Sequence, residues 1–389
     1  MGRAYDVAVL GGTPAGYVAA LCIAKARKDV VVMDAPQQGS ECPLCDWAPA
    51  GTMRIKGLPK ALAASWGANR SAGTSLPACS ARAGGPSPFS TVVYHDVKLE
   101  RTAQYRSSKP AGVFVSFTDL RDRLRRDAEQ AGVRLIATKT PPAIELLEDH
   151  VRLVNTSQVA ARLLLIAQGS PAEAMANLAM SARSAAPTQL AAAGLDVPVG
   201  RKDAARLAGA LHVVEMPERT ELGVFFALGQ TVHIRVISHS LAAGARAEEL
   251  SGLVGKLQEA GLLPGKMQLG RAKGAVWHPP AGAALELERH VAKRCLLLGT
   301  AGGFAESVAG GTIRATIESA VIAAQTALDA LARPDTQEAL GGFRTAWRKR
   351  QAAYLGPPST SLHLLLPLLF VNKTIVARFT RALLYGEAI

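Results

Sequence analysis

A glycine-rich turn near the start of the chain has residue types and spacing suited to holding a phosphate group. An apolar run over residues 5–10 ends at Gly11, and residues 17–27 then carry apolar side chains at helical spacing. Gly11 permits a sharp bend from strand to helix, and Gly16 lets the helix pack closely on the strand. The N-terminus of that helix offers free N–H groups and a partial positive charge to a pyrophosphate. The candidate binding residues of this turn are Gly11, Gly12, Thr13, Pro14, Ala15 and Gly16.

A carboxylate follows where a dinucleotide-binding unit places its acidic residue. A second apolar run over residues 30–33 ends at Asp34, which completes a βαβ unit. At the end of the second strand, a carboxylate can accept hydrogen bonds from the ribose hydroxyls of adenosine. Turn, helix, strand and acid in this order predict a site for the ADP half of a dinucleotide. The alternative is a packing turn in a fold that has lost its cofactor.

The length and composition indicate a large globular protein. A chain of 389 residues is longer than one hydrophobic core usually serves, so we expect two closely connected domains. With 49% hydrophobic and 19% charged residues, the composition argues against disorder and favours an α/β protein with buried sheets. The formal charge of +13 attracts anions such as cofactor phosphates, acidic lipids or nucleic acid. Because the arginines are scattered and aromatic residues make up only 5%, we expect no nucleic-acid partner.

The elements that would position the turn form two sheets. A helix over residues 120–132 and strands over 133–137 and 159–167 are expected to complete the first sheet. Runs over 222–228 and 231–237 alternate around a glycine turn, and they predict an antiparallel second sheet.

Later segments return the chain to the first sheet. An apolar strand over residues 295–298 precedes a glycine-rich loop over 299–311 and a helix over 312–331. Residues 69–90 are rich in Ser, Gly, Pro and Ala, and this composition predicts a surface loop. After Pro334 the chain again favours helix.

The C-terminal tail contains an apolar stretch over residues 362–371. Spanning a bilayer takes about 20 apolar residues, and Pro367 interrupts this shorter stretch. With the positive net charge, the stretch predicts peripheral rather than integral contact with a membrane. Strand-like residues begin by Asp6, which leaves no room for a secretory leader, so we expect a cytoplasmic protein.

The odd number of cysteines predicts reduced thiols rather than a disulfide framework. Cys42 and Cys45 are open to two interpretations. A redox-active pair would need a thiolate stabilised by a helix terminus or a cation. The other interpretation is ordinary thiols in a loop that lines a substrate cavity. The histidines form no metal-spaced cluster and the remaining cysteines lie singly, so we predict no metal site. These remaining cysteines are Cys22, Cys79 and Cys295.

Three parts of the sequence together resemble one group of flavoproteins. The string from Asp6 to Gly16, the acid at Asp34 and the late segment from Leu298 to Ile313 are similar to the geranylgeranyl reductase and p-hydroxybenzoate hydroxylase group. The resemblance implies an α/β fold with a Rossmann-like (glutathione-reductase-type) FAD-binding domain, an antiparallel-sheet substrate domain and C-terminal helices. The implied boundaries are 1–90, 115–170 and 285–330 for the FAD-binding domain, 91–114 and 200–284 for the substrate domain, and 335–389 for the tail.

The same resemblance implies further FAD contacts in the late segment. In this group, the acid of a Gly-Asp-Ala strand end binds the ribityl chain, and a glycine turn opens a helix whose N-terminus faces the flavin pyrimidine edge. The corresponding residues here are Gly299, Thr300, Gly310, Gly311, Thr312 and Ile313. Five residues depart from the group's pattern. Thr13 and Thr312 replace glycines, Thr300 replaces the ribityl-binding Asp, Gln168 replaces an acid, and Phe117 lies where the group has an arginine near the cofactor.

The resemblance implies an FAD-dependent oxidoreductase in which the isoalloxazine carries the chemistry. The leading expectation is reduction of a C=C bond in a hydrophobic, isoprenoid or lipid-like small molecule. One alternative is a flavin monooxygenase of an aromatic or lipid substrate, and another is a non-catalytic ligand-binding descendant that has lost FAD. No catalytic side chain and no external electron donor are identified.

Overall fold

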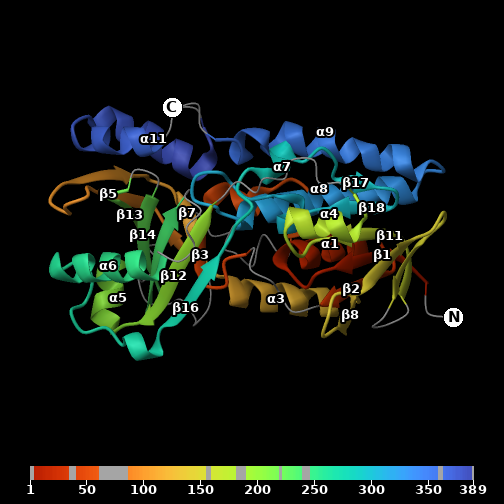
Figure 1. Ribbon diagram of the computed structural model, residues 1–389, viewed down its shortest axis with the longest axis horizontal. Coiled ribbons are helices and arrows are strands. Elements are labelled where there is room, and N and C mark those ends of the chain that lie inside the picture. The colour runs from red at the N-terminus through yellow and green to blue at the C-terminus, as the bar shows by residue number, and fades with distance from the viewer. Residues whose placement is uncertain are drawn as a thin grey trace.

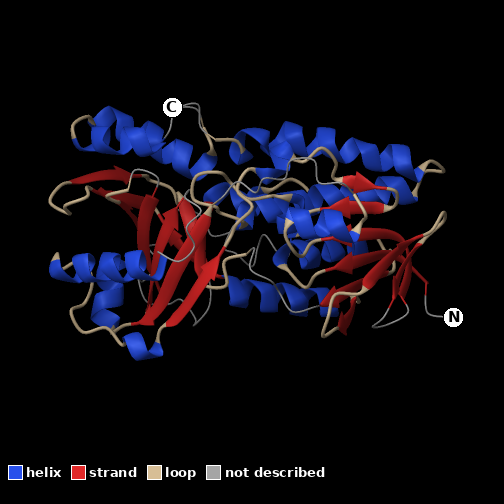
Figure 2. Cartoon of the chain, viewed as in Figure 1, coloured by secondary structure: helices blue, strands red, loops and turns tan. Residues whose placement is uncertain are grey.

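The computed structural model describes residues 4–34, 41–60, 86–154, 159–180, 190–218, 221–238, 246–357 and 362–387. Figure 1 and Figure 2 show an elongated arrangement in which the strands gather in two groups at opposite ends and helices run along both. The strands form a mixed eight-stranded sheet, a seven-stranded sheet and a small three-stranded sheet.

The first sheet contains the glycine turn's strand at its centre. Its order is β17-β18-β11-β1-β2-β8, and the pairings from β18 to β8 are parallel. β17 pairs antiparallel with β18, β10 pairs antiparallel with β11, and β9 pairs antiparallel with β10. The strands are β1 (Ala4–Leu10), β2 (Val30–Asp34), β8 (Arg134–Ala137), β9 (Ala143–Leu146), β10 (Val151–Val154), β11 (Val159–Ile166), β17 (Val291–Ala292) and β18 (Cys295–Leu297).

The alternating side chains of β1 are buried on both faces of this sheet. Val7 and Val9 enter the core formed with helices α1, α3, α8 and α9, whereas Ala8 and Leu10 enter the core on the α4 side. Because successive side chains of a strand point to opposite faces, a continuous apolar run is what a doubly covered parallel sheet requires. The helices are α1 (Pro14–Lys25), α3 (Phe117–Gln130), α4 (Pro171–Asn177), α8 (Ile313–Leu331) and α9 (Thr336–Leu355).

The second sheet has the order β16-β12-β15-β14-β13-β5-β6, with antiparallel pairings except between β13 and β5. Helices α5 and α6 cover one face, and the other face packs against the tail and the small sheet. The elements are β5 (Thr91–His95), β6 (Thr102–Arg106), β12 (Ala191–Pro198), β13 (Ala210–Glu215), β14 (Glu221–Leu228), β15 (Thr231–Ser238), β16 (Lys273–Trp277), α5 (Arg201–Leu207) and α6 (Arg246–Glu259).

The small sheet connects the two cores. It has the order β3-β7-β4, with β3 (Cys45–Pro49), β7 (Gly112–Ser116) and β4 (Ser87–Phe89). Phe114 of β7 stacks on Phe226 of the second sheet with ring centroids 4.3 Å apart. Ala48 and Val115, from the same two strands, belong to the core of the first sheet. The side of the second sheet that carries Phe226 therefore faces the first sheet, and we call it the inner face.

The tail folds back on the inner face. It comprises α10 (Leu362–Leu365), the short 3₁₀ helix η5 (Leu366–Phe370) and α11 (Lys373–Tyr385). The hydroxyls of Tyr94 and Thr380 lie 2.7 Å apart, and the Tyr385 hydroxyl donates to the Ala111 carbonyl at 2.8 Å. None of the helices in the described ranges is both long and apolar enough to cross a membrane.

The structure confirms each strand predicted for the first sheet and each helix predicted beside it, with ends shifted by a few residues. It also confirms the β14–β15 pair and the helical tail. One expectation is wrong. Residues 87–89, within the segment 69–90 that was expected to be a loop, form strand β4, because pairing with β7 stabilises a run that has no periodicity of its own. Residues 61–85 of that region lie outside the described residues.

Candidate functional site

The glycine turn has the conformation that its sequence predicts. Gly11 has φ of 118°, and a Cβ there would lie 2.5 Å from Cβ of Gln168 at the end of β11. A Cβ at Gly16 would overlap the Gly11 carbonyl, so α1 can approach β1 this closely only with glycine. Pro14 occupies the first turn of α1, where its missing N–H costs no helix hydrogen bond.

Thr13 caps α1 instead of leaving the helix end bare. Its hydroxyl accepts the Gly16 N–H at 3.1 Å and donates to the Ala167 carbonyl at 3.2 Å. The side chain is buried and turned toward the end of β11. A threonine therefore fits in place of the usual glycine, and its hydroxyl is used within the protein.

Asp34 lies directly beside the turn. A Cβ at Gly12 would overlap the Asp34 carboxylate, so the two residues are in close contact. The Tyr17 hydroxyl donates to Asp34 Oδ2 at 3.0 Å, and Arg125 of α3 approaches the same oxygen at 4.0 Å. The Asp34 side chain keeps 21% of its surface exposed. The structure thus places an accessible carboxylate at the carboxyl ends of β1 and β2, beside the helix N-terminus.

The late glycine segment meets the first turn. The 3₁₀ helix η4 (Gly299–Gly302) follows β18, and Gly299 has φ of 59°. A Cβ at Gly299 would lie 2.9 Å from Cβ of Ala15, so the two motifs are in contact across the sheet edge. The Ser319 hydroxyl of α8 accepts the Gly299 N–H at 3.0 Å, and the Thr300 side chain is buried.

The turn before α8 contains a carboxylate that sequence reasoning missed. Glu306 is buried, and its carboxylate accepts the N–H groups of Val308, Ala309 and Gly311 at 2.8, 2.6 and 3.0 Å. Burial raises the pKa of the Glu306 carboxyl, and the three N–H donors oppose that rise. The available signal was an acid placed directly before a run of small residues and a helix start. The carboxyl oxygens of Glu306 thus fill the nest of N–H groups ahead of α8.

The remaining residues of this turn are also buried. A Cβ at Gly310 would lie 2.5 Å from Cγ of Pro279 and 3.0 Å from Leu190, so both residues close over the turn. Thr312 precedes α8, and its buried hydroxyl has no hydrogen-bond partner within the described ranges. Ile313 is the first residue of α8 and packs in the core of the first sheet.

A buried ion pair lies between the small sheet and the inner face of the second sheet. Arg235 of β15 pairs with Asp46 of β3 at 3.1 Å, and both side chains are only 1% exposed. The guanidinium lies between two tryptophans, 4.9 Å from the ring centre of Trp47 and 4.7 Å from that of Trp277. Asp46 Oδ2 and Arg235 Nε are buried without a hydrogen-bond partner in the described part of the chain. The sequence signal was an arginine within the otherwise largely apolar β15.

The two cysteines of the Cys42–Cys45 segment adjoin this ion pair. Arg235 donates to the Cys42 sulfur at 3.0 Å and to the Cys45 carbonyl at 3.3 Å. Burial raises the pKa of both thiols well above the ordinary value, and the nearby Asp196 raises that of Cys45 further. Asp196 also accepts the Cys45 N–H at 3.0 Å and bonds to His233 at 2.5 Å. Arg235 lowers the pKa of the Cys42 thiol, but burial raises it by more. Neutral buried thiols are poor nucleophiles, which favours ordinary thiols over a redox pair.

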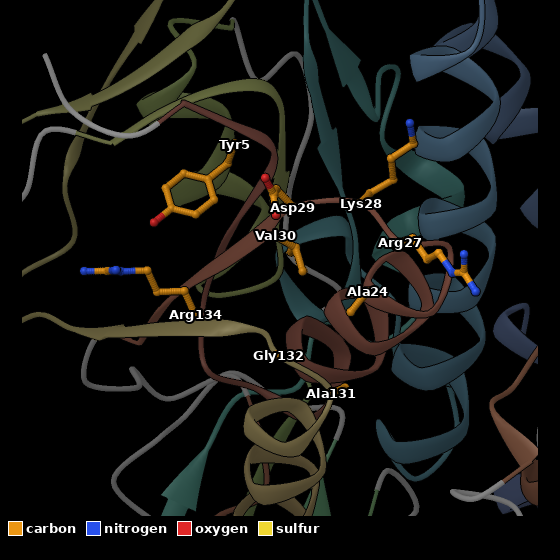
Figure 3. A pocket seen from close by; sticks show the side chains of 9 residues that line it. All are labelled: Tyr5, Ala24, Arg27, Lys28, Asp29, Val30, Ala131, Gly132 and Arg134. Atoms are coloured by element: carbon orange, nitrogen blue, oxygen red, sulfur yellow. The ribbon is translucent and has the colours of Figure 1, made fainter.

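A surface pocket of about 240 Å³ lies at the opposite end of the first sheet. It is lined by Tyr5, Ala24, Arg27, Lys28, Asp29, Val30, Ala131, Gly132 and Arg134. Figure 3 shows Tyr5 and Arg134 extending to one side, and Arg27 and Lys28 extending to the other. The pocket adjoins the amino ends of β1 and β2, so it is separate from the glycine turns, which lie at the carboxyl ends. The cations around it do not converge. No metal-binding cluster of His, Cys, Asp or Glu occurs among the described residues.

No family model and no curated protein sequence matches the chain. Solved structures nevertheless match nearly its whole length. A geranylgeranyl bacteriochlorophyll reductase-like protein from Thermoplasma acidophilum has a TM-score of 0.70 at 16% identity, covering 99% of this chain and 97% of that chain. PqsL of Pseudomonas aeruginosa, in complex with 2-aminobenzoylacetate, has a TM-score of 0.67 at 16% identity, with 97% and 99% covered. A triple mutant of a flavin-dependent brominase has a TM-score of 0.69 at 12% identity, with 98% and 96% covered. The chain therefore shares the α/β fold of these proteins, as its sequence predicts.

Proposed function

We propose that this protein is an FAD-dependent oxidoreductase that acts on a hydrophobic small molecule. The observation that carries the proposal is the joint position of Gly12, Asp34 and the Gly299 turn. All three lie at the carboxyl ends of the parallel strands, which is where open α/β sheets bind nucleotides. The proposed domain division is the one implied by the sequence resemblance, with FAD held by the first sheet and its helices.

The residues of the first turn fit the ADP half of FAD. The N-terminus of α1 offers a favourable field for the pyrophosphate, and the exposed part of Asp34 offers an acceptor to the ribose hydroxyls. Thr13 fits this role because its side chain is turned inward. When bound, FAD supplies the hydride or oxygen chemistry, while the chain provides orientation and a water-poor setting.

The turn at residues 306–312 would adjoin the flavin in this proposal. The proposed flavin contacts are Gly310, Gly311 and Thr312 of this turn, together with Thr300 of η4 and Ile313 of α8. The unpartnered Thr312 hydroxyl is a group that a ligand would satisfy. Glu306 already occupies three N–H groups of the turn, so a ligand there would meet an internal carboxylate.

The inner face of the second sheet is the proposed substrate-facing surface. On that face Phe226 and Trp277 pack with Trp47 of the small sheet, and Arg235 pairs with Asp46 of the same small sheet. The apolar character of this region supports reduction of a C=C bond in an isoprenoid or lipid-like molecule, and the aromatic rings equally suit hydroxylation of an aromatic or lipid substrate. An external electron donor is required in either case. The proposed setting is the cytoplasm, with peripheral contact to membranes as the source of a lipid-like substrate.

A second candidate is a non-catalytic ligand-binding descendant of the same fold. The observation that favours it is the Glu306 side chain in the N–H nest, because a carboxyl group that already accepts three N–H groups leaves fewer donors for a cofactor. The closure of Pro279 and Leu190 over Gly310 points the same way.

We expect the purified protein to carry FAD or to take it up. The physical reason is the complementarity of the α1 N-terminus and Asp34 to the ADP half of the cofactor. The absorbance spectrum of the native protein and titration with FAD, followed by quenching of flavin fluorescence, provide the measurement. A folded, colourless protein that takes up no FAD would instead establish the non-catalytic candidate.

Asp34→Ala is expected to weaken FAD binding by about 1.5–3 kcal/mol, the range for hydrogen bonds to a charged partner. Two matched variants test whether the loss of FAD binding is specific to the Asp34 carboxylate. Tyr17→Phe removes the internal donor to Asp34 and keeps the carboxylate, so FAD binding should persist. Asp122→Ala removes a surface acid of α3 that pairs with Arg121, and it should leave the dissociation constant unchanged. An unaltered constant for folded Asp34→Ala would show that this acid does not contact the cofactor.

A further inference from the structure

Large exposed apolar side chains concentrate at one corner of the molecule. Leu364, Leu368 and Val371 of the tail are 59%, 42% and 73% exposed, and Val97 in the β5–β6 turn is 37% exposed. We call these four residues the apolar corner. Within the described ranges, the other large apolar residues with comparable exposure are Leu269 and Val276, which lie near and on β16.

The tail segment in this corner is apolar on two sides. Leu366 and Leu369 are buried in the core beneath the inner face, so they account for the folding of α10 and η5. Leu364 of α10, Leu368 of η5 and Val371 just after η5 remain exposed while these two residues are buried. A surface helix normally carries polar residues on its outer side. Packing among the described residues therefore leaves these exposed apolar side chains unexplained, and such a patch marks an interaction surface.

The tail and the hairpin form this corner together. The Arg101 guanidinium lies over the Phe370 ring, 5.4 Å from its centre, and the hydroxyls of Tyr94 and Thr380 join β5 to α11. Figure 1 shows the dark-blue tail helices beside the orange hairpin of β5, at the end of the molecule that lies away from the first sheet. The corner is thus presented at an extremity of the molecule.

The charged residues on the same elements favour an anionic partner. Lys98, Arg101, Arg378 and Arg381 are exposed on the hairpin and on α11. Arg101 pairs with the buried Asp96 at 2.9 Å. The exposed acids on these elements and just beyond them are Glu100 and Glu387, and Glu387 lies 3.8 Å from Arg381. An apolar tip with a surplus of cations is suited to the boundary between lipid headgroups and acyl chains.

We propose that the apolar corner docks this protein onto the surface of an anionic lipid membrane. The three tail residues enter the interface, and the neighbouring cations attract the lipid headgroups. The docking surface is formed by residues outside the glycine turns, so the proposal stands independently of FAD binding.

The test is co-sedimentation of the whole protein with vesicles of phosphatidylcholine, with and without phosphatidylserine, at low salt. The wild type is expected to bind the vesicles that contain phosphatidylserine. The triple variant Leu364→Gln/Leu368→Gln/Val371→Gln is expected to bind them at least about tenfold more weakly, because three apolar side chains no longer leave water. The matched control Leu269→Gln/Val276→Gln changes equally exposed residues elsewhere and should bind like the wild type.

A charge variant keeps the test decisive if the triple variant folds poorly. Lys98→Gln/Arg378→Gln should lose roughly fivefold in vesicle binding for each charge removed, and added salt should release the wild type. Equal binding by the wild type and the folded triple variant would overturn the proposal, as would absence of binding to phosphatidylserine vesicles. Sedimentation velocity supplies a further arm: a wild-type dimer that the triple variant dissociates, without vesicle binding, would make the corner an interface between copies of this chain.

Discussion

Arg235→Met is expected to lower the free energy of unfolding by about 3–5 kcal/mol, the range for removing one partner of a buried ion pair. The variant leaves the Asp46 carboxylate in a water-poor site, where it is 1% exposed and where Oδ2 already has no described partner. It also removes the hydrogen bonds from Arg235 to Cys42 and Cys45, and the cation between the two tryptophan rings.

A double mutant shows how much of this stability loss comes from leaving the Asp46 carboxylate buried without its partner. Asp46→Asn/Arg235→Met removes both charges and should recover part of the loss, because a buried pair is often close to neutral when both partners are replaced. Arg152→Met is the control, since Arg152 and Glu145 form a half-exposed pair at 3.5 Å that should contribute less than about 1 kcal/mol. Urea midpoints and thermal midpoints provide the measurement. A loss for Arg235→Met no larger than that for Arg152→Met would contradict the buried-pair interpretation.

Glu306→Ala is expected to lower the free energy of unfolding by about 3 kcal/mol, because the carboxyl group accepts three backbone hydrogen bonds that contribute about 1 kcal/mol each. The N–H groups of Val308, Ala309 and Gly311 lose their acceptor in this variant. Formate, a small carboxylate, should raise the thermal midpoint of Glu306→Ala and leave that of the wild type unchanged, because only the variant has an empty nest. A variant as stable as the wild type would show that water replaces the carboxylate at no cost.

The same variant discriminates between the two candidate functions. If flavin adjoins the turn, the freed N–H groups become donors to the cofactor, so FAD should stabilise Glu306→Ala more than it stabilises the wild type. If the site is vestigial, FAD should raise the thermal midpoint of neither protein, and only formate should raise that of Glu306→Ala. Thermal melts of both proteins with and without FAD measure this difference. Glu338→Ala, which removes an exposed acid in the first turn of α9, is the control.

Much of the first sheet follows from short-range sequence signals. These signals are β-branched runs, the glycines at Gly11 and Gly16, and Pro14 at the helix start. Each acts on the backbone within a few residues, so its effect can be predicted without knowing the fold. The position of Asp34 beside the turn also follows, because a βαβ unit places the end of its second strand next to the end of its first. The loop expected over residues 69–90 is wrong at residues 87–89, since that strand exists through its partner β7.

The partners of buried polar groups were decided by the tertiary structure alone. The Thr13 hydroxyl could have met a phosphate, yet it donates to Ala167, 154 residues away. Arg235 reaches Cys42 across 193 residues, and no local pattern links the two. Glu306 is close in sequence to its donors, but the residues that cover the turn, Pro279 and Leu190 beside Gly310, come from distant parts of the chain. Sequence periodicity determined which segments are buried, whereas the choice among acceptors depended on which groups the folded chain brings together in a setting that excludes water.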